Sequence, residues 1–291
     1  MLKYRLIFGF MMAAVFVGLI LLDGHLDGSL YISGIRHNQP IQATIFTILI
    51  ALLAIPAQFE LGNLIKQTGA HLFKSITIPA SILIATAPLW AFLLGWFYGI
   101  ATSLSVCILI SAFSFLALFI VQALKFGTEG TIRNVSASFF SIIYLGFLCS
   151  FILGIRIAWG PWVLLTFIFT VKGSDIGAYT LGRLFGKHKM CPTISPGKTW
   201  EGLAGAAMFG ALVSFGFSHF SGIMTPLWAV GFGAVFGVLG QLGDLVESMI
   251  KRDAMSKDSS ASIPGFGGIL DVIDSPLATA PAAFAFFYFV F

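Results

Sequence analysis

Charged residues are scarce in this sequence. Asp, Glu, Lys and Arg make up 10% of its 291 residues, whereas apolar residues make up 58%. A composition this apolar leaves no room for a large soluble domain, and several runs are long enough to cross a bilayer. The formal net charge is only +4, and the cations are spread over separate polar segments. We therefore expect a polytopic membrane protein that does not bind nucleic acid.

Cysteine is also rare, and the sequence has no internal repeat. Cys107 and Cys149 lie in apolar runs and Cys191 in a basic segment, so an odd, scattered set argues against disulfides and against a zinc site. Secondary transporters often carry repeated halves and charges near the middle of the membrane. Here the charges fall between the apolar runs, so a transporter or channel stays only as a minor alternative.

The apolar runs predict an all-α bundle of about nine membrane helices. We divide the chain into N-terminal helices at 1–156 and a C-terminal catalytic region at 157–291, with polar loops at 173–202 and 244–275. The first run lacks a convincing cleavage site before Asp23, so we interpret it as a retained helix rather than a signal peptide. The expected helices are 5–22, 42–58, 76–95, 97–124, 136–155, 157–172, 203–220, 226–243 and 275–291.

Lys and Arg predict the orientation. With the N-terminus in the cytoplasm, 14 of the 16 cations face the cytoplasm, and only Arg36 and Arg156 face the other side. Both long polar loops then face the cytoplasm. The cytoplasmic cations are Lys3, Arg5, Lys66, Lys74, Lys125, Arg133, Lys172, Arg183, Lys187, Lys189, Lys198, Lys251, Arg252 and Lys257.

The N-terminal half has few polar features. We interpret Asp23, His25 and Asp27 as residues of a solvated loop, with metal binding a lesser alternative. Glu60, near Lys66, is expected to be a charge at the membrane interface. In the C-terminal half, Gly233 and Gly237 have the spacing of closely packed membrane helices.

The stretch from Gly240 to Pro276 holds six of the twelve acidic residues: Asp244, Glu247, Asp253, Asp258, Asp271 and Asp274. In a helix, the side chains of Asp244, Glu247, Ser248 and Lys251 would share one face. A loop with Pro264, Gly265, Gly267 and Gly268 follows, and its glycines would let backbone approach a ligand. Ser275 and Pro276 suggest the cap and first turn of the last helix. Two acidic pairs around a basic, glycine-rich segment suit a divalent metal and a polyphosphate, rather than an ordinary solvated loop.

The other polar segment runs from Lys172 to Gly202. Its basic residues Lys187, His188 and Lys189 suit anionic head groups or nucleotide phosphates, and equally suit a plain cytoplasmic loop. Gly197, Lys198 and Thr199 match the end of a phosphate-binding P-loop, but Pro192 stands where that motif needs glycine. We therefore reject a P-loop and keep Lys198 and Thr199 as phosphate contacts.

These residues resemble the phosphatidate cytidylyltransferase (CDP-diacylglycerol synthase) family. The resemblance is specific over roughly the last 120 residues, and the earlier part matches only as apolar helices. Two positions depart from the pattern: Phe266 stands where the family has His, and Val272 where it has Arg. The matching residues are Ser174, Asp175, Gly177, Ala178, Tyr179, Ser195, Pro196, Lys198, Thr199, Glu201, Gly202, Gly243, Asp244, Leu245, Glu247, Ser248, Lys251, Arg252, Lys257, Asp258, Pro264, Gly265, Gly267, Gly268, Asp271 and Asp274.

The resemblance implies a reaction between CTP and phosphatidate that gives CDP-diacylglycerol and pyrophosphate. It implies an enzyme of phospholipid synthesis in the bacterial inner membrane, with Mg²⁺ and a second cation left open. Both substrates, the lipid phosphate and the nucleoside triphosphate, are anions that repel each other. A metal ion and fixed cations would neutralise their negative charge. The expected metal ligands are Asp244, Asp271 and Asp274. The expected catalytic residues are Asp244, Lys251, Asp258 and Asp271. The expected substrate contacts are Asp175, Lys198, Thr199, Ser248, Arg252, Lys257, Gly267 and Gly268.

Other acceptors fit the same residues. The lipid could be an ether or isoprenoid phosphate, or the enzyme could be a CTP-dependent lipid kinase. The partners we expect are CTP, a lipid phosphate and membrane lipids, with a homodimer left open.

Overall fold

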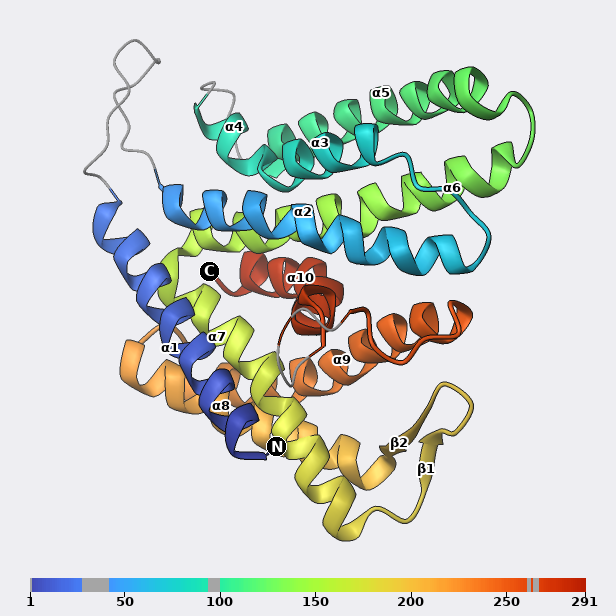
Figure 1. The fold of residues 1–291 in the computed structure, drawn as a ribbon. Coiled ribbons are helices and arrows are strands. Elements are labelled where there is room, and N and C mark those ends of the chain that lie inside the picture. Colours follow the sequence, from blue (N-terminus) through green and yellow to red (C-terminus); the bar gives the residue numbers. More distant parts are fainter. Residues whose placement is uncertain (1, 28–41, 94–99, 261–262, 264–266) are drawn as a thin grey trace. The chain divides into compact units, whose positions relative to one another are not determined.

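The computed structural model describes residues 2–27, 42–93, 100–260, 263 and 267–291, and within the described helices the side chains of residues 2–7, 92, 93 and 100–102 are left aside. These residues form an all-α polytopic membrane bundle with one short hairpin (Figure 1). Its elements are α1 (Leu2–Leu26), α2 (Thr44–Gln67), α3 (Lys74–Ala85), α4 (Ala87–Leu93), α5 (Ile100–Phe126), α6 (Thr131–Ile142), the π-helix η1 (Ile143–Phe147), α7 (Leu148–Phe185), β1 (Lys189–Cys191), β2 (Ser195–Thr199), α8 (Trp200–Ser221), α9 (Pro226–Asp253) and α10 (Ile269–Val290).

In the described part of the chain, seven helical stretches are long and apolar enough to cross a membrane. Two of the nine expected segments, 136–155 and 157–172, lie in one of these stretches, Thr131–Phe185. That stretch is kinked at Gly160, whose φ of 84° is not helical, just before Pro161. Proline lacks the N–H that would continue the helix, so the kink has a local cause. The expected segment 76–95 is described as two short helices, α3 and α4.

The chain divides into two compact units. The first consists of Met1–Ala158 with Ala254–Asp271, and the second of Trp159–Asp253 with Val272–Phe291. The chain therefore leaves the second unit after α9 and returns to it within α10. The polar segment 244–275 is therefore divided between the units. Residues 244–253 and 272–275 belong to the second unit, and residues 254–271 belong to the first.

A buried ion-pair network lies in the first unit. Arg156 is 1% exposed, and its guanidinium lies 2.8 Å from the carboxylates of both Asp23 and Asp27. Asp23 also accepts hydrogen bonds from the backbone N–H groups of Ile45 and Phe46, at the start of α2. The expectation of solvated loop residues at Asp23 and Asp27 is therefore wrong, because Arg156, distant in sequence, neutralises both carboxylates. Arg36 lies outside the described residues.

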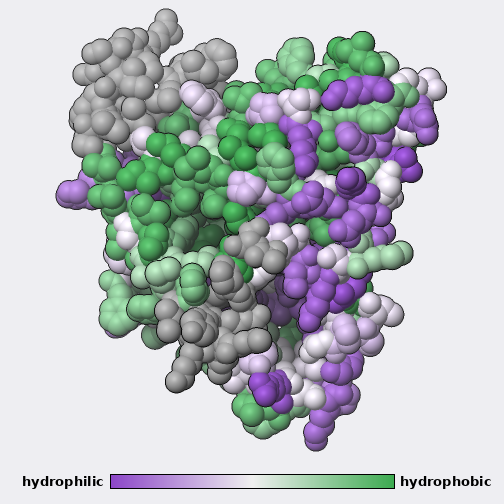
Figure 2. Space-filling view, in the orientation of Figure 1, coloured by the Kyte–Doolittle hydropathy of each residue, from purple (hydrophilic) through white to green (hydrophobic). Residues whose placement is uncertain are grey.

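Large apolar side chains cover the outside of α5. Phe113 is 70% exposed and Leu124 is 81% exposed, and Ile108, Leu116 and Ile120 are similarly open. Figure 2 shows hydrophobic residues over much of the visible face of the first unit and hydrophilic ones toward the turn between α5 and α6. Exposed apolar side chains along a whole helix are what a lipid environment requires.

Close packing of α8 against α9 organises the second unit. A methyl group on Gly233 would overlap the backbone of Gly210, and one on Gly237 would overlap the backbone of Ala206. The expected small-residue contact is therefore confirmed. Small residues let two membrane helices approach closely and gain packing energy that lipid cannot supply. In Figure 1, β1 and β2 form a hairpin that leads into α8.

More of the two polar segments forms helix and strand than expected. The loop predicted at 173–202 is wrong in its extent, because α7 continues to Phe185 and the hairpin follows. Polar pairs one turn apart suit this extension: Lys172 lies 3.8 Å from Asp175, and Arg183 donates to the Tyr179 hydroxyl. Polarity was mistaken for a loop where a helix continues beyond its apolar part.

The boundaries predicted for 244–275 also differ from the structure. Helix α9 reaches Asp253, so the expected helical face from Asp244 to Lys251 is confirmed. Helix α10 begins at Ile269, so Ser275 and Pro276 lie inside it and do not open it.

Candidate functional site

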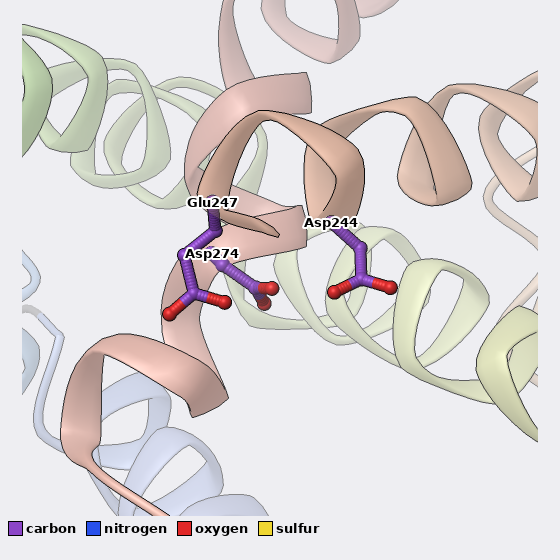
Figure 3. Close-up of side chains that lie close together, drawn as sticks. All are labelled: Asp244, Glu247 and Asp274. Carbon is purple, nitrogen blue, oxygen red and sulfur yellow. The ribbon is translucent and has the colours of Figure 1, made fainter. Parts of the chain in front are cut away.

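Three carboxylates meet in the second unit. Asp244 and Glu247 come from α9 and Asp274 from α10, and each offers an oxygen within 4.8 Å of the others (Figure 3). Glu247 and Asp274 are buried, and Asp244 is half-buried. Carboxylates this close repel one another unless cations lie beside them. The arrangement could hold a divalent metal ion, which prefers such oxygen ligands.

Each carboxylate of this cluster has a lysine partner. The Lys198 ammonium lies 2.6 Å from Asp244, and the Lys251 ammonium lies 2.6 Å from Glu247. Lys172 on α7 lies 3.1 Å from Asp274. The lysines offset the repulsion among the carboxylates, and their ammonium groups would also suit phosphate oxygens.

Two glycines of α9 bring these side chains together. A methyl group on Gly243 would lie 3.0 Å from the Ala278 Cβ and 3.2 Å from the Ser275 Cα of α10. One on Gly240 would lie 3.1 Å from the Val171 side chain of α7. These contacts are tighter than ordinary packing, so glycine allows α9 to approach both helices at the level of the cluster.

Asp175 and Gln241 extend the polar network along α7 and α9. The Gln241 amide donates to Asp175 at 2.7 Å, while the Gln241 backbone carbonyl accepts from Lys198 at 2.7 Å. Lys172 lies between Asp175, at 3.8 Å, and Asp274. The network therefore joins helix α7, the end of the hairpin, α9 and α10 around the carboxylates.

Several predicted contacts have structural partners. The Thr199 hydroxyl accepts a hydrogen bond from Gly202 N and caps α8, whose first turn carries Glu201. Exposed Arg252 donates to the Ile194 carbonyl at 3.2 Å, which fixes the turn of the hairpin. Ser248 is half-buried on α9, one residue after Glu247.

The other predicted site residues belong to the first unit. Lys257 and Asp258 are exposed. The Gly268 N–H donates to Asp271 at 2.7 Å, and the Ser259 hydroxyl donates to the same carboxylate at 2.7 Å. Asp271 thus holds its own loop, although it lies one turn before Asp274 on α10. Gly267 has a φ of 94°, which favours glycine. The expected Pro264, Gly265 and Phe266 lie outside the described residues, and Val272 lies within α10.

Sequence reasoning missed four contributors. Glu247 was placed on the face of Asp244 but not among the metal ligands, and Lys172 was counted only for orientation. Gln241 was not considered. Glu60, expected at the membrane interface, is 4% exposed and contacts the start of α10. The spacing of Lys172 and Asp175 was a usable signal, whereas nothing local could have linked Glu60 to a segment about two hundred residues later.

Comparisons with known proteins show the family of the chain. The sequence matches the cytidylyltransferase family over residues 3–290. It is 40% identical over 156 residues to a phosphatidate cytidylyltransferase of Mycobacterium bovis, covering 52% of this chain and 50% of that protein. It is 44% identical over 135 residues to one of Haemophilus influenzae, covering 45% and 46%.

These two matches span about half the length of the relatives. A third, with a phosphatidate cytidylyltransferase of Bacillus subtilis, is 33% identical over 252 residues and covers 84% of this chain and 88% of the relative. The match of the family over nearly the whole sequence, together with this long alignment, is decisive. The chain belongs to the cytidylyltransferase family.

Proposed function

We propose that this protein is a membrane nucleotidyltransferase that joins CTP and phosphatidate to give CDP-diacylglycerol and pyrophosphate. The observation that carries the proposal is the cluster of Asp244, Glu247 and Asp274, each with a lysine beside it, in a chain of the cytidylyltransferase family. Relatives named phosphatidate cytidylyltransferase support the choice of substrates.

The chemistry requires charge compensation more than a base. A phosphate oxygen of phosphatidate forms a bond to the α-phosphorus of CTP. The bond from that phosphorus to the bridging oxygen breaks, and pyrophosphate leaves with the electron pair. The attacking oxygen is already anionic, so the task is to bring two anions together and hold them in line.

The acidic cluster fits a divalent metal such as Mg²⁺. Three carboxylates from two helices supply oxygen ligands within 4.8 Å of one another. Mg²⁺ keeps part of its coordination for water and phosphate, and it would supply neutralisation of phosphate charge. We propose Asp244, Glu247 and Asp274 as its ligands. Asp271, held by Ser259 and Gly268, would instead fix the glycine loop, and a role as a metal ligand is the alternative.

We propose that the lysine ammonium groups change partners, from the carboxylates of the cluster to the phosphates of CTP. Lys198 and Lys251 now neutralise Asp244 and Glu247, and a metal among the carboxylates would release their ammonium groups for the triphosphate. Lys172 would keep Asp274 oriented. Arg252, Lys257 and the backbone of Gly267 are proposed as further phosphate contacts, with Thr199 and Ser248 as hydroxyl donors. Asp175 and Asp258 would support the cations.

The cell compartment follows from the same reasoning. The chain is an integral membrane protein, and the acidic cluster lies in the last third of α9 and the first two turns of α10. We propose the bacterial cytoplasmic membrane, with the N-terminus and the site on the cytoplasmic side where CTP is made. The cationic bias of the sequence supports this orientation.

The test is product formation by purified protein in lipid–detergent micelles. Labelled CTP with phosphatidate and magnesium should give a labelled lipid that thin-layer separation identifies as CDP-diacylglycerol. Replacing phosphatidate with a lipid alcohol tests a kinase, and an isoprenoid phosphate tests another acceptor. A labelled product only with one of those lipids would overturn the proposed substrate.

A further inference from the structure

The Glu60 carboxylate has an unusual position for a charged group. Glu60 lies in the apolar helix α2 of the first unit and is 4% exposed. One oxygen accepts from the Ser260 hydroxyl at 2.7 Å and from Ile269 N at 3.1 Å. The other accepts from Leu270 N at 2.9 Å and lies 3.1 Å from the Ser259 hydroxyl. The carboxylate therefore contacts both ends of the segment from Ser259 to Leu270.

The contact between the Glu60 carboxylate and the start of α10 is stabilised by electrostatic attraction. Burying an ionised carboxylate costs several kcal/mol unless hydrogen bonds and opposite charge compensate. The first N–H groups of a helix lack partners within it, and they carry the positive end of the helix dipole. Glu60 supplies acceptors for Ile269 and Leu270, the first residues of α10. The buried charge and the start of α10 thus stabilise each other.

Ser259 connects Glu60 to Asp271. The Ser259 hydroxyl has one proton, and its shorter contact is with Asp271 at 2.7 Å, against 3.1 Å with Glu60. Asp271 also accepts from the N–H groups of Ser259 and Gly268. A methyl group on Gly268 would overlap both the Ser259 hydroxyl and the Glu60 carboxylate, so Gly268 lies tightly against both side chains.

We propose that Glu60 is a positioning residue for the cytidylyl transfer. It fixes the start of α10 and the Ser259 turn, and through them Asp271 and the Gly268 backbone. Asp274 follows one turn later on the same helix. The inference rests on the proposed function, because the position of Asp271 and Gly268 affects the rate only if the cytidylyl transfer takes place beside them. Misplacement of a reacting group by about 1 Å costs roughly a hundredfold in rate.

The principal variant is Glu60→Gln, which keeps the size of the side chain. The amide nitrogen of the new glutamine cannot accept a hydrogen bond. The hydrogen bonds that one of the two Glu60 oxygens now accepts would therefore be lost. We expect kcat for CDP-lipid formation to fall roughly tenfold to a hundredfold. Backbone hydrogen exchange should become faster at Ile269 and Leu270 and stay parental in α5. The matched control is Glu129→Gln, the same change at an exposed residue of the same unit, which should alter neither measurement.

Two results would overturn the proposal: parental exchange at Ile269 and Leu270 in Glu60→Gln, or faster exchange with a parental kcat. If Glu60→Gln loosens the whole unit, Ser260→Ala decides, because it removes one donor and leaves the charge. It should lower kcat a few-fold with faster exchange confined to Ser259, Ser260, Ile269 and Leu270, and a parental kcat would refute the role. If the parent forms no CDP-lipid, the proposed function fails, while the exchange data still report whether Glu60 holds the segment.

Discussion

Lys172 and Asp274 are 102 residues apart in the sequence, and the Lys172 ammonium lies 3.1 Å from the Asp274 carboxylate. The pair joins α7 to α10 at the acidic cluster. Lys172 also lies 3.8 Å from Asp175, so one ammonium balances carboxylates from two helices. The cluster is therefore held in place by neighbours that are distant in the sequence.

Asp274→Asn should reduce turnover at least about a hundredfold, because it removes one carboxylate from the proposed magnesium ligands and keeps the shape of the side chain. Rates of CDP-lipid formation across a magnesium titration measure this. Asp253→Asn, the same change at an exposed residue of α9, is the control and should behave as the parent does. A parental rate for Asp274→Asn at limiting magnesium would move the metal site elsewhere.

Asp271→Asn separates the two roles considered for Asp271. Its carboxylate accepts from Ser259 and Gly268, so the variant should lose turnover through a displaced loop while its magnesium dependence stays parental. The same titration measures both. A rate that recovers when magnesium is raised would instead make Asp271 a metal ligand.

Lys251→Met should raise the KM for CTP roughly tenfold or more, because a charged hydrogen bond to phosphate is worth about 1.5–3 kcal/mol. Methionine keeps the apolar stem and avoids the buried like-charge pair that Lys251→Glu would make beside Glu247. CTP titrations of activity and of binding measure the effect, with Lys125→Met at an exposed position as control. Parental CTP affinity would show that Lys251 only neutralises Glu247.

Gly243→Ala should lower kcat roughly tenfold, because its methyl group would lie 3.0 Å from Ala278 and push α9 away from α10 beside the cluster. Gly231→Ala is a matched control on the same helix, since its methyl group meets nothing within 4 Å. Activity and melting temperature in detergent should be compared for both. Equal kcat for the two variants would contradict a need for close approach at Gly243.

Reporter fusions test the orientation. Helix α8 has 22 residues and separates Lys198 from Gly222, so the two points should lie on opposite sides of the membrane. A reporter after Lys198 should behave as cytoplasmic, and one at Gly222 as external. The reverse result would place the cluster on the wrong side for cytoplasmic CTP.

The sequence by itself determined the class of the protein and much of its chemistry. Apolar runs predicted a helical membrane bundle, and the spacing of Asp244, Glu247 and Lys251 predicted one helical face, because both patterns depend only on local periodicity. The similarity of the polar motifs to those of a known family indicated a reaction that uses CTP. Sequence polarity was a poor guide to where helices end, since α7 continues to Phe185 and α10 begins at Ile269.

Only the tertiary structure decided which charges meet. Lys172 with Asp274, Arg156 with Asp23, and Glu60 with the start of α10 are pairs whose members lie far apart in the chain. Each pair exists because a buried charge must find a partner or a helix end wherever the fold brings one. Local patterns carry no record of such partners, so the assignment of Asp271 to the glycine loop and of Glu247 to the acidic cluster had to come from packing.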